Sequence, residues 1–308
     1  MKIMKKEIQY EFRYNSKCNM CGEPFDNHKV LGKRLNQSQG KNPRKRSGIS
    51  VSVLRCKKCG LIYSNPTPIP ATIAQHYDVD PDLYWPDIED LFKEDHYKYE
   101  IETFKKLSNQ SIHGLKALDI GSGLGQSIVA LKNAGFEVKA LEPSRAFYNK
   151  AIELTGLGEE AIQLTSLEDA VLPKDYFDFV SFPNVLEHLQ NPNDAILKAL
   201  ETLKPGGLMF VCIPSAYWLQ SKIVNAYFKL IGTDYVTNLS PMHPPFHLYE
   251  FSPKSFYINA EINHYEIALL KIHPHSITSA RILSYFFKKL TEITNTGLRM
   301  DVWIRKPH

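Results

Sequence analysis

The stretch Leu118-Asp119-Ile120-Gly121-Ser122-Gly123-Leu124-Gly125 decides the fold. An apolar run leads into it from Leu115 and predicts a buried strand. Beyond the glycines, apolar residues recur at helical spacing at Ile128 and Leu131, and Gly135 is placed to end that helix. A strand that passes through a glycine-rich turn directly into a helix begins a βαβ unit of the kind that binds nucleosides.

The residues that follow indicate which nucleoside is bound. A second predicted strand, 137–141, ends at Glu142, whose carboxylate can accept hydrogen bonds from both hydroxyls of a ribose. The glycines follow the pattern G-x-G-x-G, whereas a pyrophosphate-binding loop needs G-x-G-x-x-G and would have its third glycine at Gln126. Asp119 would repel a pyrophosphate but attract the sulfonium and ammonium charges of S-adenosylmethionine. The charges therefore favour S-adenosylmethionine over NAD.

These segments resemble the class I S-adenosylmethionine-dependent methyltransferases, from about Leu115 to Ile213. The late turn Lys204-Pro205-Gly206-Gly207 and the apolar strand after it also match that family. The resemblance implies a Rossmann-like, doubly wound α/β sheet that binds S-adenosylmethionine. The cofactor contacts that it implies are Asp119, Gly121, Ser122, Gly123, Gly125 and Gln126, then Glu142 and Pro143, then Leu167 and Glu168, and finally Asn184.

Four of the five cysteines form two C-x-x-C pairs: Cys18 with Cys21, and Cys56 with Cys59. Two such pairs can place four thiolates around one tetrahedral zinc ion. Gly22 and Gly60 follow the pairs and permit a tight turn in which backbone N–H groups donate to the sulfurs. Disulfides are the alternative, but the start of the chain carries no secretory signal, so a reducing compartment is expected. We therefore predict a structural zinc ion.

The predicted organisation has three parts. Residues 1–70 form a zinc-binding module, 71–112 a helical linker and 113–308 the methyltransferase domain, in which residues 216–250 are expected to form a lid over the acceptor. No stretch reaches the roughly 20 apolar residues that cross a bilayer. A cytoplasmic location is therefore expected, and the oligomeric state is left open.

The last third of the chain predicts alternating helices and strands. The expected helices cover 216–232, 252–262 and 277–293, and the expected strands cover 264–273 and 299–305. Four apolar side chains share one face of the last helix and are predicted to lie in the core rather than at an interface: Leu283, Phe286, Phe287 and Leu290.

Two histidines are candidates for activating the acceptor. His188 follows Asn184 at the carboxyl end of the fourth predicted strand, where open sheets place their ligand-binding crevice. As a general base it would accelerate transfer by about 10² to 10⁴. Glu187 could orient it, the pair could hold a divalent cation, or His188 could only cap the next loop. His247, in the expected lid, is a second base candidate, with packing or hydrogen bonding as the alternative role.

The segment from Cys56 to Pro66 is similar to a bacterial subgroup in which paired C-x-x-C cysteines precede the methyltransferase core. This resemblance implies a sugar or nucleotide-sugar acceptor, methylated on a hydroxyl or an amine during polysaccharide biosynthesis.

Charge is unevenly distributed and supports an alternative acceptor. Residues 1–60 hold 15 Lys and Arg against 4 Asp and Glu, and the remaining residues hold 22 against 29. The basic residues Lys41, Arg44, Lys45 and Arg46 could grip phosphates, since phosphate contacts dominate nucleic-acid affinity. An RNA methyltransferase is thus the alternative enzyme, unless the run is a solvated loop. A non-catalytic binding protein is the third hypothesis.

Overall fold

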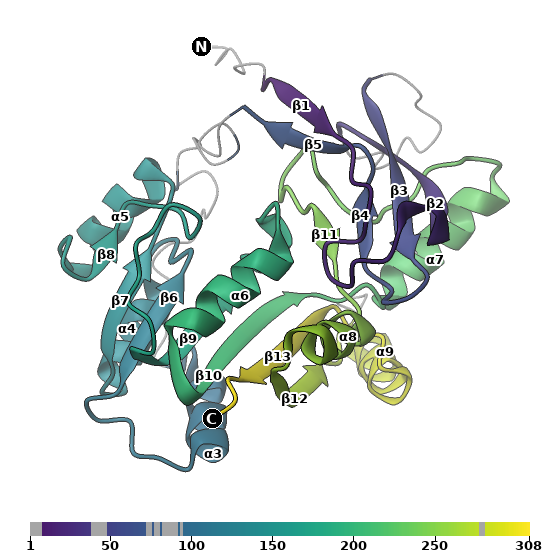
Figure 1. The fold of residues 1–308 in the computed structure, drawn as a ribbon. Helices are drawn as coiled ribbons and strands as arrows, with labels where there is room; N and C mark the ends of the chain where they lie inside the picture. The colour runs from purple at the N-terminus through teal and green to yellow at the C-terminus, as the bar shows by residue number, and fades with distance from the viewer. Residues whose placement is uncertain are drawn as a thin grey trace. The chain divides into compact units, whose positions relative to one another are not determined.

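The computed structural model describes residues 8–37, 48–71, 76, 81, 92, 95–276 and 281–308. The basic run from Lys41 to Arg46 lies outside these residues. The chain divides into two compact units (Figure 1). The first unit comprises Met1–Arg13 and Pro68–Leu172, and the second comprises Tyr14–Thr67 and Pro173–His308.

The first unit contains three parallel strands, hydrogen-bonded in the order β6-β7-β8. Their bounds are β6 (Lys116–Ile120), β7 (Glu137–Leu141) and β8 (Ile162–Gln163). Helix α4 (Gln126–Asn133) connects β6 to β7, and helix α5 (Arg145–Thr155) connects β7 to β8. This alternation confirms the βαβ unit predicted around the glycine turn.

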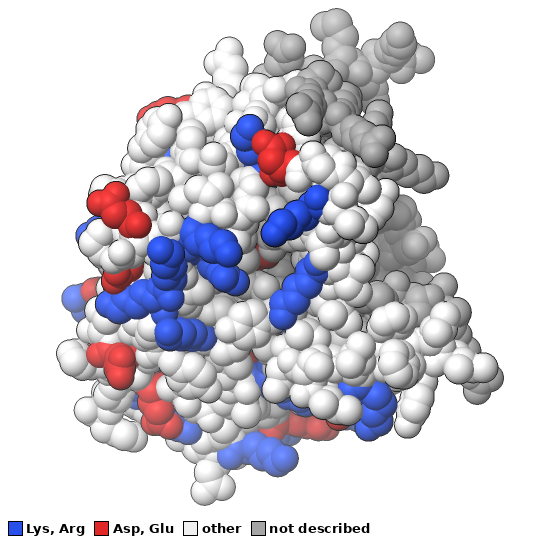
Figure 2. All heavy atoms as spheres, turned by 90° about the vertical axis from the view of Figure 1, so that its right-hand side faces the viewer, with Lys and Arg blue, Asp and Glu red and all other residues white. Residues whose placement is uncertain are grey.

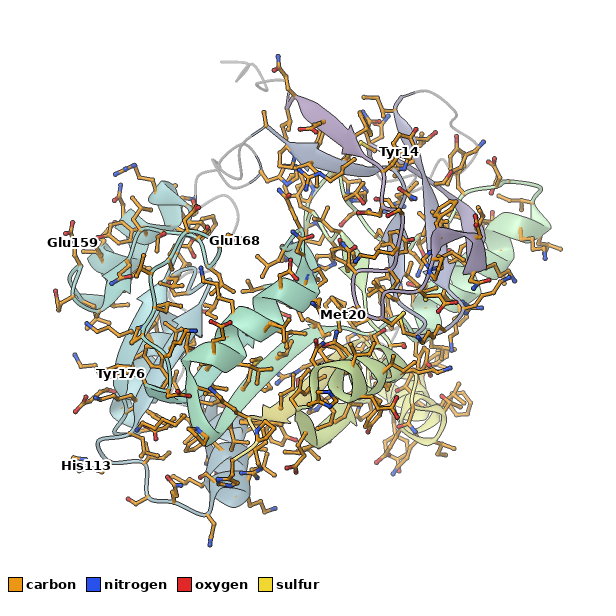
Figure 3. The ribbon with its side chains drawn as sticks, viewed as in Figure 1. Tyr14, Met20, His113, Glu159, Glu168 and Tyr176 are labelled. Carbon is orange, nitrogen blue, oxygen red and sulfur yellow. The ribbon has the colours of Figure 1, made fainter. Side chains whose placement is uncertain are left out.

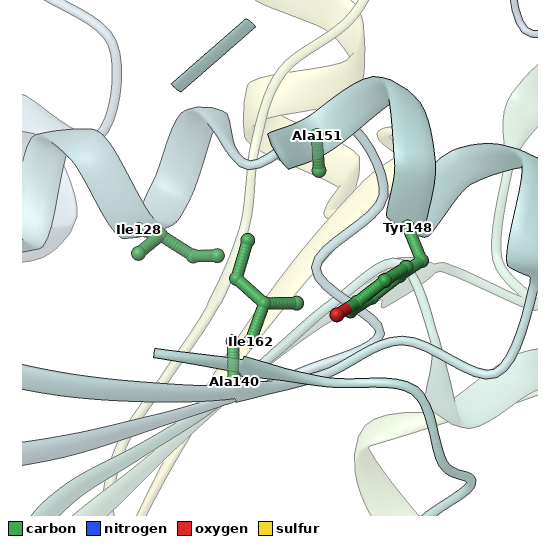
Figure 4. Close-up of a cluster of buried hydrophobic side chains, with 5 residues drawn as sticks. All are labelled: Ile128, Ala140, Tyr148, Ala151 and Ile162. Carbon is green, nitrogen blue, oxygen red and sulfur yellow. The ribbon is translucent and has the colours of Figure 1, made fainter. Parts of the chain in front are cut away.

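Buried side chains hold these helices on the strands. One cluster draws on α4, α5, β7 and β8, and its members are Ile128, Ala140, Tyr148, Ala151 and Ile162 (Figure 4). Full burial of a large aliphatic side chain is worth about 1.5–3 kcal/mol. The cluster therefore fixes the end of the glycine turn from which α4 starts.

Within the first unit, the described residues before β6 form two strands and a helix. Strand β1 (Tyr10–Arg13) pairs with β5 (Thr67–Pro70) in a two-stranded sheet. Helix α3 (Lys98–Ser108) follows and buries Phe104 against Phe136, with the ring centroids 5.2 Å apart. Helix α3 lies within the predicted helical linker 71–112, but much of 72–94 is outside the described residues, so the linker stays a prediction.

The second unit contains a mixed sheet in the order β12-β13-β10-β9. Its strands are β9 (Phe177–Pro183), β10 (Leu203–Pro214), β12 (Glu266–Ile272) and β13 (Arg299–Arg305). The first two are parallel, whereas β13 is antiparallel to both β10 and β12. Trp303 is fully buried in β13, and its ring lies 5.8 Å from that of Phe179 and 4.9 Å from that of Phe210. The two strands predicted late in the chain are confirmed as β12 and β13.

Three helices of the second unit agree closely with the predicted ranges: α7 (Leu219–Leu230), α8 (Pro253–Asn263) and α9 (Arg281–Thr294). Helix α6 (Pro192–Thr202) had no predicted range. Ser252 starts α8 as a reciprocal cap, because the Ser252 and Ser255 side chains each accept the other's backbone N–H. Residues 277–280, which belong to the last predicted helix, lie outside the described residues.

The cysteine pairs flank an antiparallel sheet in the order β11-β4-β3-β2, in which Cys56 is the last residue of β3. Its strands are β2 (His28–Leu35), β3 (Ser50–Cys56), β4 (Ile62–Ser64) and β11 (Tyr249–Glu250). Tyr249 of β11 pairs with Tyr63 of β4, so residues late in the chain extend the N-terminal sheet. The predicted division of the chain into a zinc-binding module (1–70), a helical linker (71–112) and a methyltransferase domain (113–308) stays a prediction.

The prediction that α9 buries its apolar face is wrong for two of the four residues named, Leu283 and Phe286. Phe286 is 58% exposed and Leu283 is 53% exposed, while Phe287 and Leu290 are only half-buried. Helical spacing shows which residues share a face, but it does not show how much partner surface covers that face. As for membranes, no helix in the described part of the chain combines the length and the apolar character needed to span a bilayer.

Candidate active site

The glycine-rich turn lies between β6 and α4 in the first unit. Gly121, Gly123 and Gly125 have left-handed backbones, with φ of 68°, 54° and 86°, which glycine adopts without strain. A β-carbon on Gly125 would lie 2.7 Å from the Thr155 methyl carbon, whereas one on Gly123 would meet no heavy atom within 4 Å. Gly125 therefore allows close packing against α5. Gly123 leaves open space beside the turn, just before α4 begins at Gln126.

The Glu142 carboxylate lies beside this turn. It accepts hydrogen bonds from the backbone N–H of Gly123 and of Ser144, both at 2.8 Å. Burial raises the pKa of Glu142 to about 7, outweighing these two hydrogen bonds, and the negative charge of Asp119 adds to the rise. The carboxylate thus links the turn after β6 to the turn after β7, a position suited to a ribose.

Two more polar side chains complete the cluster in the first unit. Asp119 is fully buried and accepts a hydrogen bond from the Ser127 hydroxyl on α4. The Ser122 hydroxyl is buried and has no hydrogen-bond partner among the described residues. A buried hydroxyl without a partner is costly, and a polar ligand in the open space at Gly123 could satisfy it. These residues fit a nucleoside cofactor of the S-adenosylmethionine type.

The other predicted cofactor residues of the first unit lie on the loops after β7 and β8. Pro143 is half-buried and Leu167 is buried, whereas Glu168 is exposed (Figure 3). The Ser166 hydroxyl donates to the Asp169 carboxylate at 2.9 Å and accepts the Asp169 backbone N–H at 3.2 Å, which fixes the loop. Cofactor contact at these residues stays a prediction.

Asn184 belongs to the second unit, where it follows β9. Its backbone is left-handed, with φ of 57°, a conformation that asparagine tolerates better than most residues. Its backbone N–H donates to the Cys212 carbonyl at 2.9 Å, and its side-chain oxygen accepts a hydrogen bond from the Cys212 thiol at 3.7 Å. These contacts fix the turn at the carboxyl end of β9, and the cofactor contact of Asn184 stays a prediction.

The two candidate histidines lie together in the second unit, around a buried carboxylate. His188 ends the short helix η3 (Leu186–His188), and the rings of His188 and His247 are 4.9 Å apart. The Glu187 Oε1 atom lies 3.9 Å from His188 Nε2 and 3.8 Å from His247 Nε2. The sequence suggested Glu187 only as a partner of His188, and the structure adds His247 to the pair.

Burial dominates the electrostatics of this cluster. Glu187 is fully buried, and neither of its carboxylate oxygens has a hydrogen-bond partner among the described residues. Burial raises the pKa of Glu187 to about 8 and lowers the pKa of His188 to about 4. Burial also lowers the pKa of His247 to about 3, helped by the neighbouring His188 and His243. Both imidazoles are therefore neutral at neutral pH and keep a lone pair for a proton or a cation.

The four paired cysteines converge in the second unit. All are free and buried, with Cys18 Sγ 3.5 Å from Cys59 Sγ and Cys21 Sγ 3.6 Å from Cys56 Sγ. Sulfurs bound at 2.3 Å to a tetrahedral zinc ion lie about 3.8 Å apart, so this arrangement fits zinc. The expected N–H donors differ in part. Gly22 and Gly60 donate to the carbonyls of Cys18 and Cys56 at 2.9 Å, and the donor to the Cys56 sulfur is the Cys59 N–H at 3.5 Å.

Helix α8 holds the cysteine cluster in a way that sequence reasoning missed. The hydroxyls of Ser252 and Ser255 donate to the Cys59 carbonyl at 2.7 and 3.1 Å, and the Asn259 amide donates to the Met20 carbonyl at 2.7 Å (Figure 3). The same two serines also cap α8, and no motif in the sequence links Ser252 to Cys59, 193 residues earlier.

With this geometry established, comparison with known proteins identifies the family. The family model described as "Methyltransferase domain" matches residues 92–257, more than half of the chain. The chain therefore belongs to the methyltransferase-domain family, and it is an S-adenosylmethionine-dependent methyltransferase with a Rossmann-like α/β fold. This confirms the predicted enzyme class and removes the non-catalytic binding protein as an alternative.

Individual relatives are more distant. The chain is 28% identical over 162 residues to a ubiquinone biosynthesis O-methyltransferase of Aliivibrio fischeri, covering 51% of this chain and 67% of that enzyme. It is 31% identical over 132 residues to the enzyme of the same name from Azoarcus sp., covering 42% of this chain and 54% of that enzyme. An S-adenosylmethionine-dependent methyltransferase structure from Mesorhizobium loti aligns at a TM-score of 0.47 and 15% identity, over 64% of this chain and 93% of that one.

Proposed function

We propose that this methyltransferase transfers the methyl group of S-adenosylmethionine to a hydroxyl oxygen of a small-molecule acceptor. The observation that carries the proposal is the convergence of Glu187, His188 and His247 at the carboxyl end of β9. A hydroxyl must lose its proton to become a strong nucleophile, and a histidine ring placed at the reacting group is the side chain that most often accepts such a proton. The relatives named as O-methyltransferases support oxygen as the acceptor atom.

The cofactor would bind in the first unit. When bound, S-adenosylmethionine supplies an electrophilic methyl group. Gly123 provides the space, the unpartnered Ser122 hydroxyl is available to the ligand, and Glu142 would accept hydrogen bonds from the ribose hydroxyls. These residues would orient the cofactor, and orientation supplies much of the acceleration in such displacements.

We propose that the acceptor is a small molecule that bears a hydroxyl. More specifically, we propose a sugar or a nucleotide-sugar, because the segment from Cys56 to Pro66 is similar to the bacterial subgroup described above. The names of the curated relatives instead support an acceptor of the kind used in ubiquinone biosynthesis. The experiment below therefore offers both kinds.

RNA receives less support than a small molecule. Figure 2 shows Lys and Arg side chains grouped on one face, with Asp and Glu side chains nearby. In the described part of the N-terminal sheet, Lys33 pairs with Asp234 at 2.9 Å, and Arg34 is buried. Lys33 is ion-paired and Arg34 is buried, so these two residues make poor phosphate ligands, whereas Lys29 and Arg55 of the same sheet are exposed. The preference for a small molecule therefore rests on the names of the curated relatives.

We also propose that the four cysteines hold a structural zinc ion. The sulfur spacing and the burial of all four side chains support a closed site, which stabilises a fold rather than reacting with substrate. We further propose that residues 216–250 form a lid over the acceptor, because His247, a candidate base, lies within that segment.

The proposal is tested with S-adenosylmethionine labelled in its methyl group. The purified chain is offered total RNA, a pool of nucleotide sugars and a pool of phenolic small molecules, in separate reactions. We expect label in a small-molecule fraction, carried as an ether. We also expect His188→Ala to lower the rate by about 10² or more, while the exposed-residue control His113→Ala keeps it. Label in RNA, or label on carbon or nitrogen, would overturn the proposal.

A further inference from the structure

We infer that Glu187, His188 and His247 form a second metal site, which takes a divalent transition-metal ion and is distinct from the four-cysteine site. One ligand atom from each of the three side chains lies within 4.8 Å of the other two. All three residues belong to the second unit. Binding of the ion stands on its own, whereas its use in activating the acceptor rests on the proposed function.

The distances in the cluster suit metal ligands and do not suit hydrogen bonds. The separations of 3.9 and 3.8 Å between Glu187 Oε1 and the two Nε2 atoms are too long for a hydrogen bond. Ligands bound at about 2.1 Å to a tetrahedral ion lie about 3.4 Å apart. The separations between Glu187 Oε1 and the two histidine nitrogens need to shorten by only about half an ångström for the three side chains to share one ion.

The unpartnered carboxylate is the second observation that points to a ligand. Glu187 is fully buried, and neither oxygen has a hydrogen-bond partner among the described residues. Leaving a buried carboxyl group without a hydrogen-bond partner costs about 1–3 kcal/mol. A cation bound between Glu187 and the two imidazoles would remove that cost, because it supplies the opposite charge where the lone pairs converge.

Backbone contacts around the cluster orient the ligands as a metal site requires. His188 Nδ1 lies 3.3 Å from the Phe246 carbonyl, so Nδ1 carries the proton and Nε2 keeps its lone pair on the side of Glu187. His247 is held by Ser240, whose hydroxyl accepts the His247 N–H at 3.1 Å and whose N–H donates to the His247 carbonyl at 3.1 Å. The Leu248 N–H donates to the Glu187 carbonyl at 2.9 Å, which ties the two ligand segments together.

The ligand set selects the class of ion. Two imidazole nitrogens and one carboxylate suit Zn²⁺ or Fe²⁺, whereas Mg²⁺ and Ca²⁺ prefer oxygen ligands. Three protein ligands leave a coordination position open for a substrate group. An ion there would lower the pKa of a hydroxyl placed on it, so that the hydroxyl proton would pass to water. The oxygen lone pair would then form a bond to the methyl carbon while the sulfur–methyl bond breaks, and the sulfur would keep that electron pair as S-adenosylhomocysteine leaves.

Metal content tests the inference directly. The full-length chain is loaded with excess Zn²⁺, desalted and analysed for zinc per chain, with Mg²⁺ as the comparison ion. We expect two zinc ions per chain in the wild type, and one each in His247→Ala and Glu187→Met. The control His113→Ala should keep two ions, and Mg²⁺ should not be retained. Loading with Co²⁺ separates the sites, because thiolate-to-cobalt absorption should persist in both variants.

Folding is checked by thermal unfolding without added metal. Glu187→Met removes a buried, unpaired carboxylate, so its midpoint should equal or exceed that of the wild type. One zinc ion in wild type and variants alike overturns the metal site, even if His188→Ala still abolishes methyl transfer and the proposed function stands. Two ions that fall to one in the variants, with methyl transfer unchanged, support the site but overturn its role in acceptor activation.

Discussion

The glycine turn of the first unit and the Glu187–His188–His247 cluster of the second unit are both polar sites at strand ends, but they are built differently. The residues around the turn, from Asp119 to Glu142, are close in sequence, and backbone N–H groups organise them. The cluster joins His188 to His247, 59 positions later, and depends on three side chains. A site organised by backbone groups should be disrupted by substitution of its glycines, whereas a site formed by side chains should be disrupted by substitution of any one of those side chains.

The largest effect is expected from substitution in the four-cysteine cluster, which like the Glu187–His188–His247 cluster lies in the second unit and is formed by side chains from separate segments. Cys56→Ser should remove one zinc ion per chain and lower the thermal midpoint by more than about 10 °C, because a structural zinc ion contributes directly to folding. Metal analysis and calorimetry measure both quantities. The control is Cys212→Ser, which should keep the ion. A Cys56→Ser protein with full zinc content would show that the cluster holds no metal.

The next effect tests the turn of the first unit. Gly123→Arg should weaken S-adenosylmethionine binding by about 100-fold or more, because the side chain fills the open space beside the turn. Gly156→Arg is the matched control. Gly156 also has a left-handed backbone and open space around it, so the backbone strain is similar but the cofactor site is untouched. Calorimetric titration should find binding retained in Gly156→Arg, and equal losses in both variants would contradict the assignment.

A smaller effect follows from the protonation of Glu142. With its pKa raised to about 7, the carboxylate that accepts ribose hydroxyls forms as pH rises through 7. S-adenosylmethionine should therefore bind about tenfold more weakly at pH 6 than at pH 8. In the absence of cofactor, the effect of pH on folding stability has the opposite sign. The free energy of unfolding should fall as pH rises from about 4.5 through 7, because Glu142 keeps its proton in the folded protein over that range and loses it in the unfolded protein. Glu142→Gln should flatten both profiles, and a pH profile unchanged in that variant would assign the titration elsewhere.

The smallest effect distinguishes exposed from buried aromatic residues in the second unit. Phe286→Ala on α9 should change the free energy of unfolding by less than about 0.5 kcal/mol, because the side chain is 58% exposed. Phe210→Ala, at 1% exposed in β10, should cost about 3–5 kcal/mol. Denaturant unfolding measures both. A large decrease in the free energy of unfolding of Phe286→Ala would instead support the prediction that this face of α9 is buried.

The elements around the glycine turn could be predicted from the sequence because their signals are local. The apolar run, the glycine spacing and Glu142 lie within one βαβ unit, and β7 has the bounds that its pattern predicted. The two C-x-x-C motifs could also be recognised locally, since two residues of spacing let the sulfurs of a motif turn towards one point. The short sulfur contacts join one motif to the other, Cys18 to Cys59 and Cys21 to Cys56.

The remaining features depend on contacts between distant segments, and periodicity carries no information about those. Nothing near His247 indicates that it meets Glu187, and nothing in the cap of α8 indicates that it supports Cys59. The exposure of α9 was missed for the same reason, because helical spacing does not reveal the neighbouring surface.

The account's central claim is that the first unit binds the cofactor while the cluster in the second unit activates the acceptor. The most direct measurement compares S-adenosylmethionine affinity and methyl-transfer rate in His247→Ala and the wild type. We predict an affinity within about twofold of the wild type and a rate lower by about 10² or more. Loss of cofactor binding in His247→Ala, or a rate that stays at the wild-type level, would contradict the claim.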